Sequence, residues 1–267
     1  MRKFIYRYKY LPDMIGIEGV IAKGTIKFTH PANFNDPFDC MPRSKFGDYS
    51  GLKTKNPEMY NALGGHIRHP VNRLAATSRV LRVLEQKVVK GEMVTDLLSD
   101  ASVLSLSKIP DSILMWSHYA RYHTGAVVEF KIPIDNYYEP HFETYYNLLP
   151  FDVTYSNVRP TMEYSAAPTD AETIVDTLFM TKSDVWAYEQ ESRVLKNRGG
   201  EGIFEYNHTH LNAVIIGAKN NDLRPIHAMA KKASAEIGHE VGFFRAEFCD
   251  KNYSIKIPKF RKKKDAE

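Results

Sequence analysis

Short stretches of the chain alternate apolar and polar residues or are rich in aromatic and β-branched residues, which is typical of strands. These stretches are KFIYRYKYL and GTIKFTH near the start, ASVLSLSKI, AVVEFKI and FDVTYS in the middle, and SRVLKN, AVIIGA and GFFRAEF near the end. Pro31 is expected to end the second stretch, because proline has no backbone N–H for a strand ladder. Short strands are therefore expected along the whole chain.

Other stretches repeat apolar residues at three- and four-residue spacing, which indicates helices. A short helix is expected at residues 13–21, and a longer helical region at 56–101 with a break at Gly91. Further helices are expected in DSILMWSHYARYH, TDAETIVDTLFMTK and LRPIHAMAKKASAEIG. The expected N-cap is Asp13 or a neighbour for the helix at 13–21, Asp111 for DSILMWSHYARYH, and Thr169 or Asp170 for TDAETIVDTLFMTK.

The order of these elements shows no regular βαβ alternation, which favours an α+β fold over a doubly wound sheet. The chain has 267 residues, enough for one sizeable core or two small ones. We expect a single α+β domain over residues 1–258 with a helical insertion at about 56–101. The basic tail at residues 259–267 is expected to be disordered.

Composition excludes several classes of protein. The apolar runs are far too short to span a bilayer, and the N-terminus lacks the continuous apolar segment of a signal peptide. Cys40 and Cys249 are the two cysteines, so a disulfide framework is not indicated. The sequence therefore predicts a soluble, cytoplasmic protein with no membrane partner.

The formal net charge is +4, and part of the excess lies in the tail and in residues 66–90. A basic patch attracts phosphates, but the chain has no aromatic RNA-binding platform and no recognition-helix signature. A solvated helix face explains the spacing of these charges about as well as a nucleic-acid site does. Both interpretations stay open.

Common catalytic and metal-binding motifs are missing. The histidine pairs HIRH, HYARYH and HTH are not joined to a second cluster with the spacing of a zinc site, so no metal is expected. Asp36 and Asp39 flank Pro37 in the stretch PANFNDPFDC, where turn chemistry is the better explanation. There is no Gly-x-Ser-x-Gly elbow and no P-loop lysine.

Glu189 and Glu191 form the most informative pair of charges. In an extended segment they would project to the same side, where two carboxylates repel unless a cation neutralises them or one does chemistry. In a helix, Glu189 and Arg193 would instead form an i,i+4 salt bridge with no catalytic role.

Three blocks of sequence resemble a bacterial family, the domain of unknown function 2971 (DUF2971). These blocks are FNDPFDC, LSLSKIPDSILMWSHYARYHTGAVVEF and KSDVWAYEQESRVL, and their order and spacing are also similar to those of the family. The resemblance begins at IYRYKYL and reaches about Leu195. It implies no particular activity.

The chain also resembles the ADP-ribosyltransferases more weakly. That resemblance implies a mixed, mainly antiparallel sheet, which could be split, with a first-strand basic residue that binds NAD. Arg7 would take that position, although Lys9 or Tyr8 could take it instead. Ser105 and Ser107 would form the Ser-rich strand that orients the nicotinamide ribose, although the block here is Ser-Leu-Ser and not Ser-Thr-Ser.

The same resemblance implies that Glu191, with Glu189 beside it, cleaves the nicotinamide–ribose bond of NAD. A carboxylate can stabilise the oxocarbenium character that develops on the ribose. Tyr119 would stack on the nicotinamide, and Asn35 or Asp36 would face the ligand from the loop that contains PANFNDPFDC. NAD would be the substrate, and the acceptor could be a protein side chain, a nucleic-acid base or water, in a phage-defence or toxin context.

Two other functions stay open. One is a non-catalytic, regulatory module that binds a nucleotide or another protein through the same pocket. The other is a nuclease, which would need a cluster such as Asp36, Asp39, Glu191 and Lys182. Each residue of the transferase site also has a purely structural interpretation, for example Arg7 as a surface charge and Ser105 as part of a polar strand face.

Overall fold

The structure, a computed structural model, describes residues 3–134 and 143–260. Two compact units make up the chain, and each is described by itself. Unit 1 contains residues 1–30, 101–153 and 185–267, and unit 2 contains residues 31–100 and 154–184. The expected tail at 259–267 lies mostly outside the described residues, which end at Phe260.

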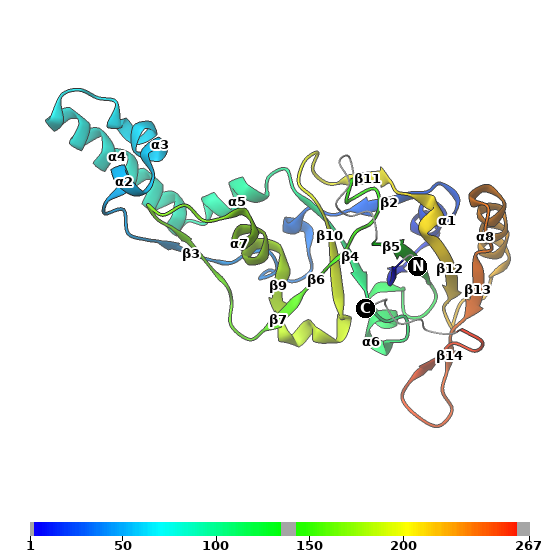
Figure 1. Cartoon of the computed structure of the whole chain (residues 1–267). Helices are drawn as coiled ribbons and strands as arrows, with labels where there is room; N and C mark the ends of the chain where they lie inside the picture. Colours follow the sequence, from blue (N-terminus) through cyan, green and yellow to red (C-terminus); the bar gives the residue numbers. More distant parts are fainter. Residues whose placement is uncertain (1–2, 135–142, 261–267) are drawn as a thin grey trace. The chain divides into compact units, whose positions relative to one another are not determined.

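Unit 1 is built on a seven-stranded sheet with the strand order β13-β12-β5-β1-β4-β10-β6 (Figure 1). Its neighbouring strands are antiparallel except for β12 and β13. The α+β prediction with a mixed, mainly antiparallel sheet is therefore confirmed. The strands are β1 (Phe4–Leu11), β4 (Ser102–Ser107), β5 (Ala126–Pro133), β6 (Phe151–Asp152), β10 (Glu191–Lys196), β12 (Leu211–Ile216) and β13 (Gly242–Arg245).

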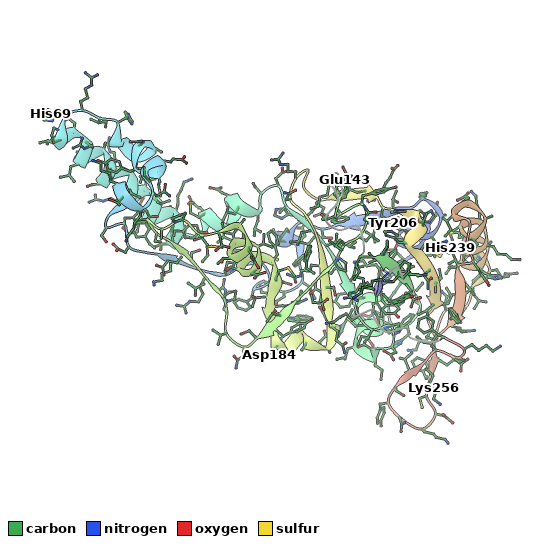
Figure 2. All side chains as sticks on the ribbon, viewed as in Figure 1. His69, Glu143, Asp184, Tyr206, His239 and Lys256 are labelled. Carbon is green, nitrogen blue, oxygen red and sulfur yellow. The ribbon has the colours of Figure 1, made fainter. Side chains whose placement is uncertain are left out.

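Helices cover both faces of this sheet. Apolar residues of α1 (Met14–Ala22) and α8 (Arg224–Ile237) share a core with one face, and α6 (Ile113–Tyr119) packs on the other. Tyr206, labelled in Figure 2, is buried in the first core and donates a 2.9 Å hydrogen bond to the carbonyl of Val20 in α1. Burial of both faces explains the near-continuous apolar run AVVEF in β5.

The sheet opens between β1 and β4. These two strands share a single paired position, Tyr8 with Ser107, whereas β1 pairs with β5 along its whole length. On the far side of the opening, β4 no longer pairs with β1. Its residue Val103 pairs with Thr29 instead. Thr29 follows β2 (Thr25–Phe28), which forms a separate ribbon with β11 (Gly202–Glu205). The sheet is thus split.

Local signals in the sequence place most helix ends of unit 1 correctly. The Asp13 carboxylate caps α1 by accepting a hydrogen bond from the backbone N–H of Gly16, and Gly238 ends α8 in the left-handed conformation. The expected cap at Asp111 is wrong by one residue, because the Ser112 hydroxyl accepts the bond from Met115 N–H. The remaining elements of unit 1 are η4 (Asp184–Glu189, of which Asp184 belongs to unit 2), η5 (His208–His210), β14 (Glu247–Phe248) and β15 (Ile255–Lys256).

Unit 2 contains the expected helical region. Gly91 adopts a left-handed conformation between α4 and α5, which confirms the expected break. Two pairs of short parallel strands, β3 with β8 and β7 with β9, complete the unit. The elements are η1 (Pro31–Asn33), β3 (Arg43–Phe46), α2 (Leu52–Lys55), α3 (Pro57–Tyr60), η2 (Asn61–Gly65), α4 (Pro70–Val89), α5 (Glu92–Leu98), β7 (Thr154–Ser156), β8 (Thr161–Tyr164), α7 (Ala171–Val175), η3 (Asp176–Met180) and β9 (Thr181–Ser183).

Two sequence expectations need correction. FDVTYS was expected to be one strand, but β6 and β7 are separated at Val153 and belong to different units. The segment TDAETIVDTLFMTK begins as a helix capped by Asp170, as expected, but ends in β9. The β-branched Thr181 takes an extended conformation there, so the three-residue and four-residue spacing overestimated the length of the helix.

In the described residues, no helix is long and apolar enough to cross a bilayer.

The turn between α6 and β5 is tightly packed. Gly125 lies so close to β1 that a Cβ atom would be 2.1 Å from the Leu11 carbonyl oxygen and 3.1 Å from that of Ala120. Before it, Arg121, Tyr122 and His123 all have positive φ angles of 46°, 54° and 70°. Each left-handed non-glycine residue costs roughly 1–2 kcal/mol, so the packing of this turn must compensate for considerable backbone strain.

Gly125→Ala is expected to lower the free energy of unfolding by at least about 2 kcal/mol, because backbone atoms must move to accept the new methyl group. Gly16→Ala in α1 is the matched control, since its Cβ would meet only ordinary contacts at 3.5 Å or more. It should be neutral or stabilising by up to about 1 kcal/mol. Urea denaturation followed by tryptophan fluorescence measures both changes, and equal effects would contradict this account.

Candidate functional site

Tyr8, Ser107 and Glu191 form a row across the sheet of unit 1 on the face that α6 covers. Ser107 pairs with Tyr8 of β1 on one side and with Glu191 of β10 on the other. Directly paired residues place their side chains on the same face. All three side chains are buried, with exposed fractions of 1–3%.

Glu191 is held by Arg193, two residues further along the same strand. The Arg193 Nε–Glu191 Oε1 distance is 2.9 Å and the second guanidinium nitrogen lies 3.1 Å from Oε2, so the pair is bidentate. Arg193 is fully buried. A buried guanidinium this close favours the charged form of the carboxylate and fixes its orientation.

Glu189 belongs to a different segment from Glu191. It ends η4, and Gln190 after it adopts a left-handed conformation with φ 44°. The Tyr119 hydroxyl donates a 2.6 Å hydrogen bond to Glu189 Oε1, and the Ser107 hydroxyl donates one of 2.6 Å to the Glu189 carbonyl oxygen. The expectation of an extended segment and that of a helix with a Glu189–Arg193 bridge are both corrected, because the turn at Gln190 separates the two carboxylates.

Lys9 lies where the sheet opens. Its ammonium donates a 3.0 Å hydrogen bond to the backbone carbonyl of Ser105 in β4. In an unbroken sheet, this carbonyl would accept a hydrogen bond from a neighbouring strand. Burial lowers the pKa of Lys9 to about 8, although the nearby carboxylates of Glu191 and Glu189 act in the opposite direction. Lys9 is therefore expected to lose its proton at a lower pH than an ordinary lysine does.

These residues line a small recess next to a larger hollow. The recess has a volume of about 60 Å³ and includes Lys9, Ser105, Ser107, Glu189 and Glu191 in its walls. The hollow has a volume of about 440 Å³, which is within the range of small-molecule sites. It lies between the end of β1, helix α1 and strand β2, and it shares Lys9, Tyr10 and Tyr119 with the recess.

Arg7 lies elsewhere. Its guanidinium is 4% exposed and donates to the Ser192 hydroxyl at 2.8 Å, to the Tyr6 carbonyl, and to Asp152 Oδ1 at 3.2 Å. Arg7 does not line the recess or the hollow. The two residues that could take its expected role do: Tyr8 lines the recess, and Lys9 lines both spaces. Of the expected residues of unit 1, the structure thus brings together Tyr8, Ser105, Ser107, Tyr119, Glu189 and Glu191.

Asn35, Asp36 and Asp39 belong to unit 2. Asp36 Oδ1 accepts a 2.9 Å hydrogen bond from the backbone N–H of Phe38, which is the expected turn chemistry. Asp39 and Lys182, both buried in the same unit, form a 3.5 Å ion pair. Phe38 of the same loop is 63% exposed, and Arg159 lies over its ring.

A known protein family matches part of the chain. Residues 115–194 match the model of a family described as a protein of unknown function, DUF2971. The predicted resemblance to DUF2971 is confirmed over this stretch. It contains Tyr119, Glu189, Glu191 and Arg193, whereas Lys9 and Ser107 lie before it. No curated protein and no solved structure gave a significant match.

The DUF2971 match carries no chemistry of its own, so the chemistry must come from the side chains. In the described parts of the chain, no group of three or more His, Cys, Asp or Glu residues is placed to hold a metal ion. The sequence suggested Lys9 only as an alternative to Arg7, and it paired Arg193 with the wrong glutamate. The i,i+2 spacing of Glu191 and Arg193 could have indicated the true pair, once β10 was taken to begin at Glu191.

The lowered pKa of Lys9 should make the free energy of unfolding depend on pH in the alkaline range. Between pH 8 and 10.5 the unfolded chain keeps the Lys9 proton while the folded chain releases it, so folding is favoured as the pH rises. Compared with Lys9→Met, the wild-type protein should gain up to about 1.4 kcal/mol per pH unit in this range. Urea denaturation at intervals from pH 7 to 10 measures the difference. A pH-independent difference, or the same trend for the exposed control Lys231→Met, would contradict the assignment.

Proposed function

We propose that unit 1 is an ADP-ribosyltransferase-like enzyme that cleaves the nicotinamide–ribose bond of NAD. The observation that carries the proposal is the pair of buried carboxylates, Glu189 and Glu191, in a recess that adjoins the hollow of the split sheet. A split, mainly antiparallel sheet with a late Glu-x-Glu is also the arrangement that the resemblance to ADP-ribosyltransferases implies. The proposal extends to transfer onto an acceptor or onto water.

The dimensions of the two spaces support this proposal. The recess is too small for a dinucleotide and suits only the reacting bond, while the 440 Å³ hollow can take a nucleoside-sized part of the substrate. Tyr119 lines both spaces and offers an aromatic ring for the nicotinamide. Lys9 and Lys27 also line the hollow and supply positive charge for a phosphate, although Lys27 forms an ion pair with Glu201 at 2.8 Å.

The chemistry assigns separate roles to the two carboxylates. When the C–N bond to nicotinamide breaks, its electron pair leaves with the nicotinamide and positive charge develops on the ribose. Glu191, ionised beside Arg193, stabilises that charge. A hydroxyl of the acceptor, or water, then bonds to the ribose carbon, and Glu189 takes its proton. The Ser107 and Tyr119 hydroxyls hold the Glu189 segment in place.

A second candidate is a module that binds a nucleotide without cleaving it. The same hollow favours this function, and the tight hydrogen bonding of both glutamates is compatible with a purely structural role. The nuclease has less support. Asp39 and Lys182 of its cluster form an ion pair in unit 2, but Glu191 belongs to unit 1, and the described residues contain no group of three or more side chains that could hold a metal.

Release of nicotinamide tests the proposal. The full chain incubated with NAD should produce free nicotinamide, detected by chromatography, and Glu191→Gln should lower the rate by at least about 100-fold. Glu191→Gln also removes the counter-charge of the buried Arg193, which can cost about 3–5 kcal/mol of stability. The thermal unfolding of each variant must therefore be recorded beside its rate.

Asp152→Asn is the matched control. It weakens a partner of another buried arginine, Arg7, but lies outside the recess. It should retain the wild-type rate at temperatures where it is folded. Binding of NAD without any release of nicotinamide, tested with water and with a protein and a nucleic-acid acceptor, would favour the binding module and contradict the enzyme.

A further inference from the structure

The positive charge of unit 2 is concentrated in one helical segment. The segment 52–91, here called the basic arm, contains α2, α3, η2 and α4 and carries eight Lys and Arg residues against two Glu. Its formal charge of +6 exceeds the +4 of the whole chain, so all other residues together are acidic. The helices of the arm contact one another in sequence order (Figure 1). Figure 2 shows His69 at the turn before α4.

Much of α4 lies at the surface, with Val88 as its one fully buried residue. Arg79, Arg82 and Lys90 share one face at spacings of three and eight residues, and all three are exposed. From Arg79 to Lys90 this face is roughly 16 Å long, at about 1.5 Å per residue. Cations form a row on this face, on which the exposed Val83 also lies.

Acidic partners do not neutralise this row. In the described chain, Arg68, Arg79 and Arg82 have no ion pair, and Lys90 has only a 3.8 Å contact with Glu92. Uncompensated charges on one helix repel one another, so this arrangement lowers the stability of the isolated helix. Binding of an anionic partner would remove that repulsion.

We propose that the basic arm docks on the phosphate backbone of a nucleic-acid duplex. Arginine side chains bind phosphates through two parallel hydrogen bonds, and a row of them along a helix suits a regular row of phosphates. The contact is independent of base sequence, because it involves only the backbone. DNA and RNA duplexes share this phosphodiester chemistry.

Other anionic surfaces fit less well. Binding to single strands commonly uses stacking of bases on several aromatic side chains, and Tyr60 is the one Phe, Tyr or Trp in the basic arm. Membrane-surface helices present a continuous apolar face, whereas Arg82 and Glu85 interrupt the exposed Val71, Leu74 and Val89 on α4.

Fluorescence anisotropy of labelled 25-base-pair DNA and RNA duplexes with the full chain tests the proposal. The wild-type protein should bind at about 50 mM KCl, and Arg79→Gln/Arg82→Gln should weaken binding about tenfold or more. Loss of two phosphate contacts should also reduce the slope of log affinity against log salt by about 1.8 on DNA. Comparison of the two duplexes shows which nucleic acid is preferred.

Lys231→Gln/Lys232→Gln is the matched control, since it removes the same charge from exposed positions of another helix, α8. Binding within twofold of wild type by this control supports the proposal, with circular dichroism to verify the fold of both variants. Equal weakening by the two double variants would overturn it, as would the absence of duplex binding by the wild type. Tighter binding to single-stranded DNA, to polyglutamate or to phosphatidylserine vesicles would also overturn it.

Discussion

The separation of β1 from β4 is the constraint on which the rest of unit 1 depends. The two strands meet only at Tyr8 and Ser107, so the backbone of β4 beyond that point needs other partners. Thr29 provides one and the Lys9 ammonium provides another, by binding the Ser105 carbonyl. Because Lys9 is drawn into the opening, a cation with a lowered pKa lies beside two carboxylates. The same opening creates the hollow.

Glu191 and Arg193 add rigidity next to this opening. Two buried opposite charges on one strand are costly to separate, so the pair holds both side chains of β10 in one arrangement. Glu189 is held by other contacts, which include the Tyr119 hydroxyl on its carboxylate and the Ser107 hydroxyl on its carbonyl oxygen. The two carboxylates are therefore positioned by different partners, which is what an unequal division of chemical roles requires.

Much of the fold could be predicted from the sequence where signals are local. Asp13, Gly91 and Gly238 act through their own backbone neighbours, and the elements they limit were placed correctly. The site was harder to predict, because it depends on pairing between distant strands. The spacing of Glu189 and Glu191 could not reveal the left-handed Gln190, and nothing near Arg7 in the sequence indicates its contacts with Ser192 and Asp152. Long-range pairing decided both.

The pairing of Thr29 with Val103 also bears on how the chain could have been assembled. These residues exchange two 2.9 Å backbone hydrogen bonds, and the segment 31–100 of unit 2 begins and ends beside them in sequence. The segment 31–100 thus leaves unit 1 after Thr29 and returns to it before Val103, and these two residues are hydrogen-bonded to each other. Such a junction tolerates changes of length, because the ends stay together whatever lies between them. A change in the length of segment 31–100, which includes the basic arm, would therefore leave this junction of the split sheet in place.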